Sequence, residues 1–165
     1  MAAGGNHADM FLKLDGVEGE SSDQKHSKEV EILSFAFGAT QPGSAGHGGG
    51  AGIGKVQVQD FHFSKYYDKA SPKLFEACCT GKHIPKVVLT CRKAGGDQQE
   101  YLKVTMSEAI VSSLQNSGSG GDTLPSESVT LNFSKIEIEY KAQDEKGGLT
   151  GVVKAGWDLS KNVKV

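Results

Sequence analysis

The sequence predicts a mainly β protein of a single domain, with one short helix. Three observations carry this prediction. Apolar residues alternate with a period of two in at least six segments, which clusters of Gly, Asp, Asn and Ser separate from one another. One segment, residues 71–81, instead has the start and stop residues of a helix. The length of 165 residues fits one domain over residues 1–165, because domains commonly run from about 50 to 250 residues.

The expected strands follow the alternation along the chain. The first contains Met10, Leu12 and Leu14 and closes at the turn residues Asp15 and Gly16. The other alternating segments cover approximately residues 28–38, 55–66, 86–93, 100–114, 127–141 and 151–159. Alternation of this kind is typical of strands that bury one face.

In three of these segments the apolar residues change parity in mid-run. In residues 28–38, the even-numbered Val30 and Ile32 give way to Leu33, Phe35 and Phe37. The same change falls at residues 59–60 and at residues 134–135. A change of parity within one strand requires one extra residue. A β-bulge supplies this residue and also bends the strand. We therefore expect bent strands in a closed barrel or in two sheets joined at corners, or else strands whose second face packs on a neighbouring subunit.

Residues 71–81 predict the one helix. Ser71 is expected at the N-cap, Pro72 at the first helical position and Gly81 just past the end. Two pairs of side chains lie one turn apart and can dock on a sheet: Leu74 with Cys78, and Phe75 with Cys79. A helix of this length is stable only when it is packed.

Composition and charge exclude several classes of function. Lys and Arg total 18 against 20 Asp and Glu, without a basic block, which argues against binding of nucleic acid. The apolar runs are far shorter than the roughly 20 residues that cross a bilayer, so we expect no membrane insertion. The N-terminus lacks the pattern of a secretory signal peptide, so we expect synthesis in the cytoplasm. The three cysteines have neither disulfide nor zinc spacing.

Two glycine-rich stretches are expected to be loops, residues 40–54 and 116–122. The first is long for a compact domain, so it is a candidate for function or for contact with a partner. Its residues 49–55, GGAGIGK, resemble part of a phosphate-binding loop. Val56 stands where Ser or Thr should hold magnesium, and a strand follows instead of a helix. We therefore expect no catalytic residue, cofactor or metal site; an enzyme that uses Lys55 for a phosphorylated substrate remains the alternative to test.

Several segments together resemble one known family. They are DMFLKLDGVEGES at 9–21, ILSFAFG at 32–38, KVQVQDFHFSKYYDKASPKL at 55–74, GKHIP at 81–85, LTCRKAGG at 89–96, EYLKVTM at 100–106, SVTLNFSKIEIEY at 128–140 and GW at 156–157. In this order, over nearly the whole chain, they are similar to the Hcp (haemolysin co-regulated protein) family, the tube proteins of type VI secretion systems. Residues 1–8 look longer than the family's usual start, and we expect them to form a flexible tail.

The resemblance implies a compact two-sheet β-barrel with one short flanking helix. It implies a homo-hexameric ring, stacking of rings into a hollow tube, and partners that are a spike protein at the tube tip, contractile sheath proteins and small effectors in the lumen. It implies assembly in the bacterial cytoplasm and secretion to the extracellular space or into target cells. The chain stops at Val165, soon after the last expected strand, so we expect no appended toxin domain and no enzyme activity.

The resemblance also assigns roles to two groups of residues. The loop at 40–54 would reach a neighbouring ring, through Thr40, Gln41, Pro42, Gly43, Ser44, His47 and Ile53. Ser34 and Ala36 alternate with Leu33, Phe35 and Phe37, so they form a small, smooth face that would line the lumen. A monomeric β-barrel that binds a small ligand in its interior is the alternative function.

Overall fold

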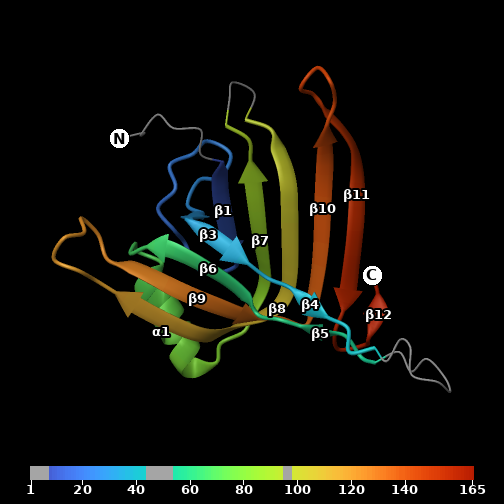
Figure 1. The fold of residues 1–165 in the computed structure, drawn as a ribbon. Coiled ribbons are helices and arrows are strands. Elements are labelled where there is room, and N and C mark those ends of the chain that lie inside the picture. The colour runs from blue at the N-terminus through green and yellow to red at the C-terminus, as the bar shows by residue number, and fades with distance from the viewer. Residues whose placement is uncertain (1–7, 44–53, 95–97) are drawn as a thin grey trace.

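The computed structural model describes residues 8–43, 54–94 and 98–165, which form two antiparallel sheets, a separate hairpin and one helix (Figure 1). The first sheet has the order β12 (Val163–Lys164), β11 (Leu149–Asp158), β10 (Lys135–Gln143), β8 (Glu100–Ser117), β7 (Ile84–Arg92), β1 (Asp9–Leu14) and β2 (Val30–Glu31). The second has the order β3 (Ser34–Ala36), β6 (Phe61–Tyr66), β9 (Ser126–Asn132) and β8. The hairpin pairs β4 (Ala39–Thr40) with β5 (Gln57–Val58). The predicted mainly β fold with one short helix is confirmed.

Strand β8 belongs to both sheets and joins them. Its residues up to Ala109 pair with β7, and those from Ile110 onward pair with β9. Between the two parts, Glu108 has a φ of 51°, in the left-handed region that few non-glycine residues occupy. The register with β9 shifts once more between Val111 and Ser113. One strand therefore turns a corner and serves two sheets, as the sequence predicted for strands of this fold, although β8 is not one of the segments that change parity.

The parity changes have a different structural cause from the one expected. At each of them a strand ends and the next begins with new partners: β2 and β3 flank residues 32–33, β5 and β6 flank residues 59–60, and β9 and β10 flank residues 133–134. The expectation of a bulge inside one continuous strand is therefore wrong. Because each new strand lies in another sheet, its core face has the opposite parity.

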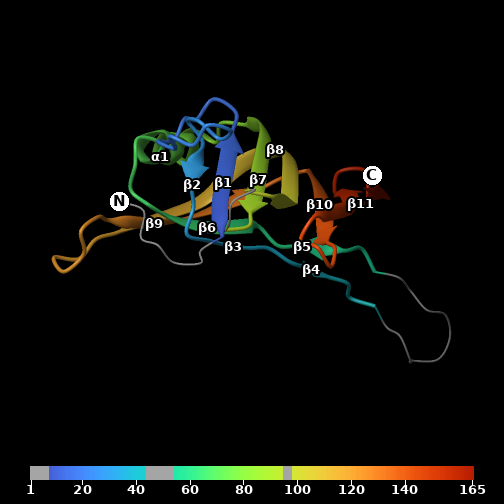
Figure 2. The same cartoon turned by 90° about the horizontal axis from the view of Figure 1, so that it is seen from above.

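Among the described residues, the strand pairings do not close the two sheets into a barrel. Within the described residues, β12 and β2 are the outer strands of the first sheet, and the second sheet ends at β3. The two sheets are thus open at their edges, and the chain itself passes from β2 to β3 between them. Seen from above, the β4–β5 hairpin continues the line of β3 away from the body (Figure 2).

The start of helix α1 (Ser71–Thr80) lies over the paired strands β6 and β9, and the helix packs against β8. Its N-cap is Ala70, so the expected N-cap role of Ser71 is wrong: the Ser71 hydroxyl donates instead to Glu127, 2.6 Å away. Gly81 ends the helix with a φ of 67°, as predicted. Leu74 is fully buried and Cys78 is half-buried, whereas Phe75 and Cys79 are exposed. Only the first of the two predicted pairs therefore docks.

The core fills the space between the sheets. Phe61 and Phe63 of β6 are fully buried and Phe61 stacks with Phe35 and Phe37, whose ring centroids lie 6.0 and 5.9 Å away. His62, between the two buried rings, points to the other face and is half-buried. The described part of the chain has no helix that is both long and apolar enough to cross a membrane.

Candidate cargo and assembly surfaces

The outer face of the second sheet is lined with small and hydroxyl side chains. Because Phe61, Phe63 and Lys65 of β6 point into the core, the residues between them point outward, and the strand register aligns these with outward residues of β3, β9 and β8. One row across the sheet is Ser34, Ser64, Ser128 and Gln115, and the next is Ala36, His62, Thr130 and Ser113. We call these eight residues the hydroxyl face.

The hydroxyl groups on this face bond mainly to one another. Ser34 Oγ contacts Ser64 Oγ, and His62 Nε2 lies 2.6 Å from Ser128 Oγ. Asp60, beside the face, accepts hydrogen bonds from Ser112 at 2.6 Å and from Asn132 at 3.0 Å. These bonds hold the side chains close to the sheet, which makes the face smooth.

The two sheets differ in the charge of their outer faces. The hydroxyl face contains no Lys, Arg, Asp or Glu, and His62 is its one titratable side chain. The outer face of the first sheet instead carries Lys13, Lys86, Lys103, Glu137, Glu139 and Lys154. Apart from Asp60 at its edge, the outer face of the second sheet is therefore neutral and polar, whereas that of the first sheet is densely charged.

The sequence identified only part of the hydroxyl face. Ser34 and Ala36 are exposed side by side on β3, on the face opposite to Phe35, as their alternation predicted. Leu33 was expected to pack with Phe35 and Phe37, but its side chain is 47% exposed. Six further members were not assigned to this face from the sequence, although the position of His62 between Phe61 and Phe63 already predicted that it points outward. They alternate with the apolar residues of β6, β9 and β8, so the same period-two pattern could have found them.

The β4–β5 hairpin projects from the body at the opposite end from α1 (Figure 1). Thr40, Gln41, Pro42 and Gly43 of the predicted stacking loop are exposed on its first arm. Ser44, His47 and Ile53 lie outside the described residues. The two arms approach closely, since a Cβ on Gly54 would stand 2.5 Å from the Pro42 carbonyl oxygen. After Lys55 the chain runs into β5, and the next described helix begins only at Ser71, so the GGAGIGK segment does not open the helix that a phosphate-binding loop requires.

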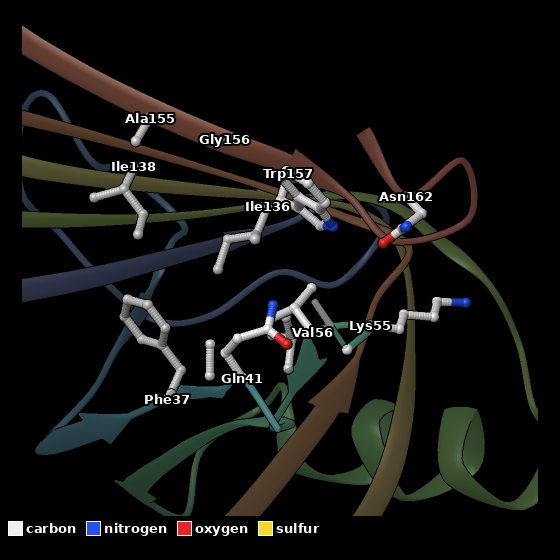
Figure 3. A pocket seen from close by; sticks show the side chains of 14 residues that line it. Phe37, Gln41, Lys55, Val56, Ile136, Ile138, Ala155, Gly156, Trp157 and Asn162 are labelled. Atoms are coloured by element: carbon white, nitrogen blue, oxygen red, sulfur yellow. The ribbon is translucent and has the colours of Figure 1, made fainter. Parts of the chain in front are cut away.

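A cavity of about 630 Å³ lies between this hairpin and the end of the first sheet (Figure 3). Its lining is mostly apolar and consists of Phe37, Gly38, Ala39, Gln41, Gly54, Lys55, Val56, Val58, Ile136, Ile138, Ala155, Gly156, Trp157 and Asn162. The indole Nε1 of Trp157 is buried and has no hydrogen-bond acceptor among the described residues. An apolar cavity with an unpaired donor is a candidate binding site.

Charged side chains at the end of β7 bond to the loop between β1 and β2. Arg92 is buried at the end of β7, where its guanidinium donates to both Asp23 oxygens at 3.0 and 2.8 Å and to Asp9 at 2.9 Å. The hydrogen bond from Arg92 lowers the pKa of Asp23 to about 2. Beside it, His26 stacks on Phe11 and bonds to the Glu29 and Glu100 carboxylates. These contacts fasten the loop between β1 and β2 to the first sheet.

Comparisons with known proteins agree with this architecture. The sequence pattern of the family described as "Type VI secretion system effector, Hcp" matches residues 11–140. The chain is 48% identical over 158 residues to protein Hcp1 of Pseudomonas aeruginosa, an alignment that covers 94% of this chain and 98% of that protein.

Solved structures show the same fold. A type VI secretion system protein superposes with a TM-score of 0.91 at 33% identity, covering 96% of this chain and 100% of the other. Hcp1 from Salmonella typhimurium superposes with a TM-score of 0.78 at 39% identity, again covering 96% and 100% of the two chains. The chain therefore belongs to the Hcp family of type VI secretion proteins.

Proposed function

We propose that this chain is a structural tube subunit of a type VI secretion system, without enzymatic activity. In this function six copies form a ring, rings stack into a hollow tube, and the tube carries small effector proteins in its lumen. A contractile sheath surrounds the tube and a spike protein caps it. The protein is made and assembled in the bacterial cytoplasm and is then secreted.

The observation that carries the proposal is the contrast between the two outer faces. The hydroxyl face, with Ser34 and Ala36 at its edge, is small, neutral and internally hydrogen-bonded, which suits the wall of a channel through which folded cargo must move. A wall of long charged side chains would bind oppositely charged cargo tightly and hinder its release. We assign the hydroxyl face to the lumen and the charged face of the first sheet to the outside of the tube.

The projecting hairpin supports the assignment of a stacking contact. Residues 40–43 are exposed, and among the described strands β4 and β5 pair only with each other, so the hairpin gains little stability from the sheets of its own subunit. Fixing the backbone of one residue costs about 1 to 2 kcal/mol of conformational entropy. For a segment that is ordered by a neighbouring subunit, this cost is offset only when the subunits assemble. We assign Thr40, Gln41, Pro42, Gly43, Ser44, His47 and Ile53 to the contact with the next ring.

Native mass measurement combined with electron microscopy of the purified protein tests the proposal. We expect a particle of six times the 17.4 kDa chain mass and images of rings with a central hole. The cavity beside Trp157 favours a second candidate, a monomeric protein that holds a small apolar ligand there. A particle that stays at 17.4 kDa at all concentrations would support this second function and reject the first.

A further inference from the structure

Exposed apolar side chains gather at two opposite ends of the molecule. One group is Tyr66, Tyr67, Phe75 and Leu124, and the other is Tyr140, Val152, Val153, Val163 and Val165. Leu33 is the one exposed large apolar side chain of the described residues that belongs to neither group. Figure 1 shows α1 and the β8–β9 connection at one end, and β10, β11 and β12 at the other. Large apolar side chains grouped in this way mark interaction surfaces.

The first group forms a protruding patch, which we call the aromatic end. The Tyr67 N–H donates to the Pro125 carbonyl at 2.8 Å, which holds Tyr67 beside Leu124. Phe75, on the first turns of α1, is 56% exposed although it is a large aromatic residue. Tyr and Phe are enriched in the cores of protein interfaces, and Tyr is among the residues that often dominate the binding energy.

Two residues of the second group, Tyr140 and Val153, continue the apolar lining of the cavity, whereas Val152, Val163 and Val165 lie on the outer face of the first sheet. The first sheet has strands beyond β8 that do not belong to the second sheet, and the inward side chains of β10 and β11 face the β4–β5 hairpin across the cavity. Ile136, Ile138 and Trp157 on this surface line the cavity, and the paired residues Tyr140 and Val153 extend it toward the edge. Val153 is 68% exposed. A sheet face of this kind is stable only when another layer covers it.

We propose that this cavity receives the aromatic end of an adjacent copy of the chain. The two surfaces lie at opposite ends of one molecule, so one copy cannot bring them together, whereas neighbouring copies can. A contact between two different surfaces of identical chains is heterologous, and repetition of such a contact closes into a ring when the rotation allows. The inference rests on the proposed ring and names the residues that build it.

Charge supports a second copy as the occupant. Lys55 is the one charged residue among the described lining of the cavity. The aromatic end carries exposed acidic residues next to its apolar ones, Glu76 beside Phe75 and Asp122 near Leu124. Opposite charges at the rim of an interface fix its orientation and speed association. The unpaired Nε1 of Trp157 also remains available for an acceptor from the incoming chain.

Cross-linking between cysteines tests the contact directly. Cys79 is exposed on α1, one turn from Phe75, and serves as the natural thiol of the aromatic end. In a Lys55→Cys variant, we expect a short bismaleimide to join Cys79 of one copy to the new cysteine of the next, giving a ladder up to the full ring on a denaturing gel. The matched control is Lys13→Cys, on the outer face of the first sheet, which should give no ladder.

The outcomes separate this inference from the proposed function. Rings that persist without a ladder in Lys55→Cys overturn the inference and leave the tube function standing. A wild-type protein that forms no rings rejects both. If Cys79→Ser in the Lys55→Cys background abolishes the ladder, the cross-link has the geometry proposed.

A second measurement uses Trp157, the single tryptophan of the chain, as a reporter inside the cavity. Phe75→Asp places a charge in the contact, so we expect monomers whose thermal stability is unchanged and whose Trp157 emission is shifted to longer wavelength. Leu33→Asp, at an exposed apolar residue outside both ends, should keep rings and emission unchanged. Phe75→Asp monomers that keep the emission of the ring and carry a bound small molecule in native mass spectra would show a ligand cavity and overturn the inference.

Discussion

Lys65 Nζ lies 2.6 Å from Glu127 Oε1, and neither side chain is exposed. The two residues are directly opposite each other on β6 and β9, and both point inward beneath the start of α1. Ser71 bonds to both partners, and Asp68 Oδ1 lies 2.8 Å from Lys65 Nζ. The Lys65–Glu127 pair thus connects the start of α1 to the second sheet, and neither of its charged groups is accessible to water.

Removing one partner of this pair should be strongly destabilising. In Lys65→Met the Glu127 carboxylate stays buried without its cation, and we expect the free energy of unfolding to fall by roughly 3 to 5 kcal/mol. The double variant Lys65→Met, Glu127→Leu removes both charges and should recover most of this loss. Urea unfolding followed by circular dichroism measures both. A single variant as stable as the wild type would show that the pair does not carry the docking of α1.

The bond between Arg92 and Asp23 should make stability depend on acid pH. The pKa of Asp23 is about 2 in the folded protein, below its ordinary value of 3.8. Because the folded-state pKa is the lower one, this contribution is present above about pH 4 and is lost as the pH falls through about 2. Asp23→Asn removes it, so we expect the variant to be less stable at pH 7 by about 1 to 3 kcal/mol.

The difference between wild type and Asp23→Asn should shrink as the pH is lowered from 4 toward 2. Thermal unfolding across this range is the measurement. Asp9→Asn is the matched control, because Asp9 contacts the same guanidinium with one bond and is half exposed, so its removal should cost less. A difference between wild type and Asp23→Asn that stays constant down to pH 2 would contradict the assignment.

The sequence predicted the strands and the helix better than it predicted their connections. Alternation located the strands because one face of each is buried, and Pro72 with Gly81 located the helix because both residues favour its ends. The changes of parity marked the places where the chain passes from one sheet to another. A bulge and a strand end produce the same change of parity in a sequence, so the sequence alone could not distinguish them. The bend at Glu108 had no local signal, because nothing in its side chain favours a positive φ.

The candidate surfaces were predictable only where they depend on one strand. Ser34 and Ala36 could be assigned from the alternation within β3, whereas the full hydroxyl face depends on which strands lie beside one another. The cavity brings Phe37 next to Ile138 and Trp157, residues about a hundred positions apart, so only the folded chain reveals it. The Ser71 hydroxyl likewise donates to the buried Glu127 carboxylate instead of capping the helix, because tertiary contacts outweigh local capping.

A large charged residue at position 36 should block cargo without affecting the ring. Ala36 is exposed at the edge of the hydroxyl face, so Ala36→Arg is expected to fold and assemble normally. In the lumen, cargo would have to bury the new charge without a partner, and we expect retention of a co-expressed effector to fall by roughly 10-fold or more. Pull-down of the effector with purified rings measures this. Ala36→Ser, which keeps the face small and polar, is the control, and equal retention by Ala36→Arg would remove the lumen assignment.

Spreading the arms of the β4–β5 hairpin should prevent stacking of rings while single rings remain. A Cβ at position 54 would stand 2.5 Å from the Pro42 carbonyl oxygen, a contact with backbone that only a movement of one arm can relieve. Gly54→Val therefore changes the path of residues 40–43 but leaves the core between the sheets intact. We expect the free energy of unfolding of the subunit to change by less than about 1 kcal/mol, because the hairpin lies outside the core.

Gly43→Ala is the matched control for this variant, since a Cβ there meets nothing within 4 Å and its φ is not positive. Electron microscopy at high protein concentration should show tubes for wild type and Gly43→Ala, and only single rings for Gly54→Val. Loss of rings as well as tubes in Gly54→Val would mean that the hairpin acts within the ring, beside the cavity that it covers. Tubes in normal number would mean that the path of residues 40–43 does not matter for stacking, and the contact between rings would then have to lie elsewhere on the molecule.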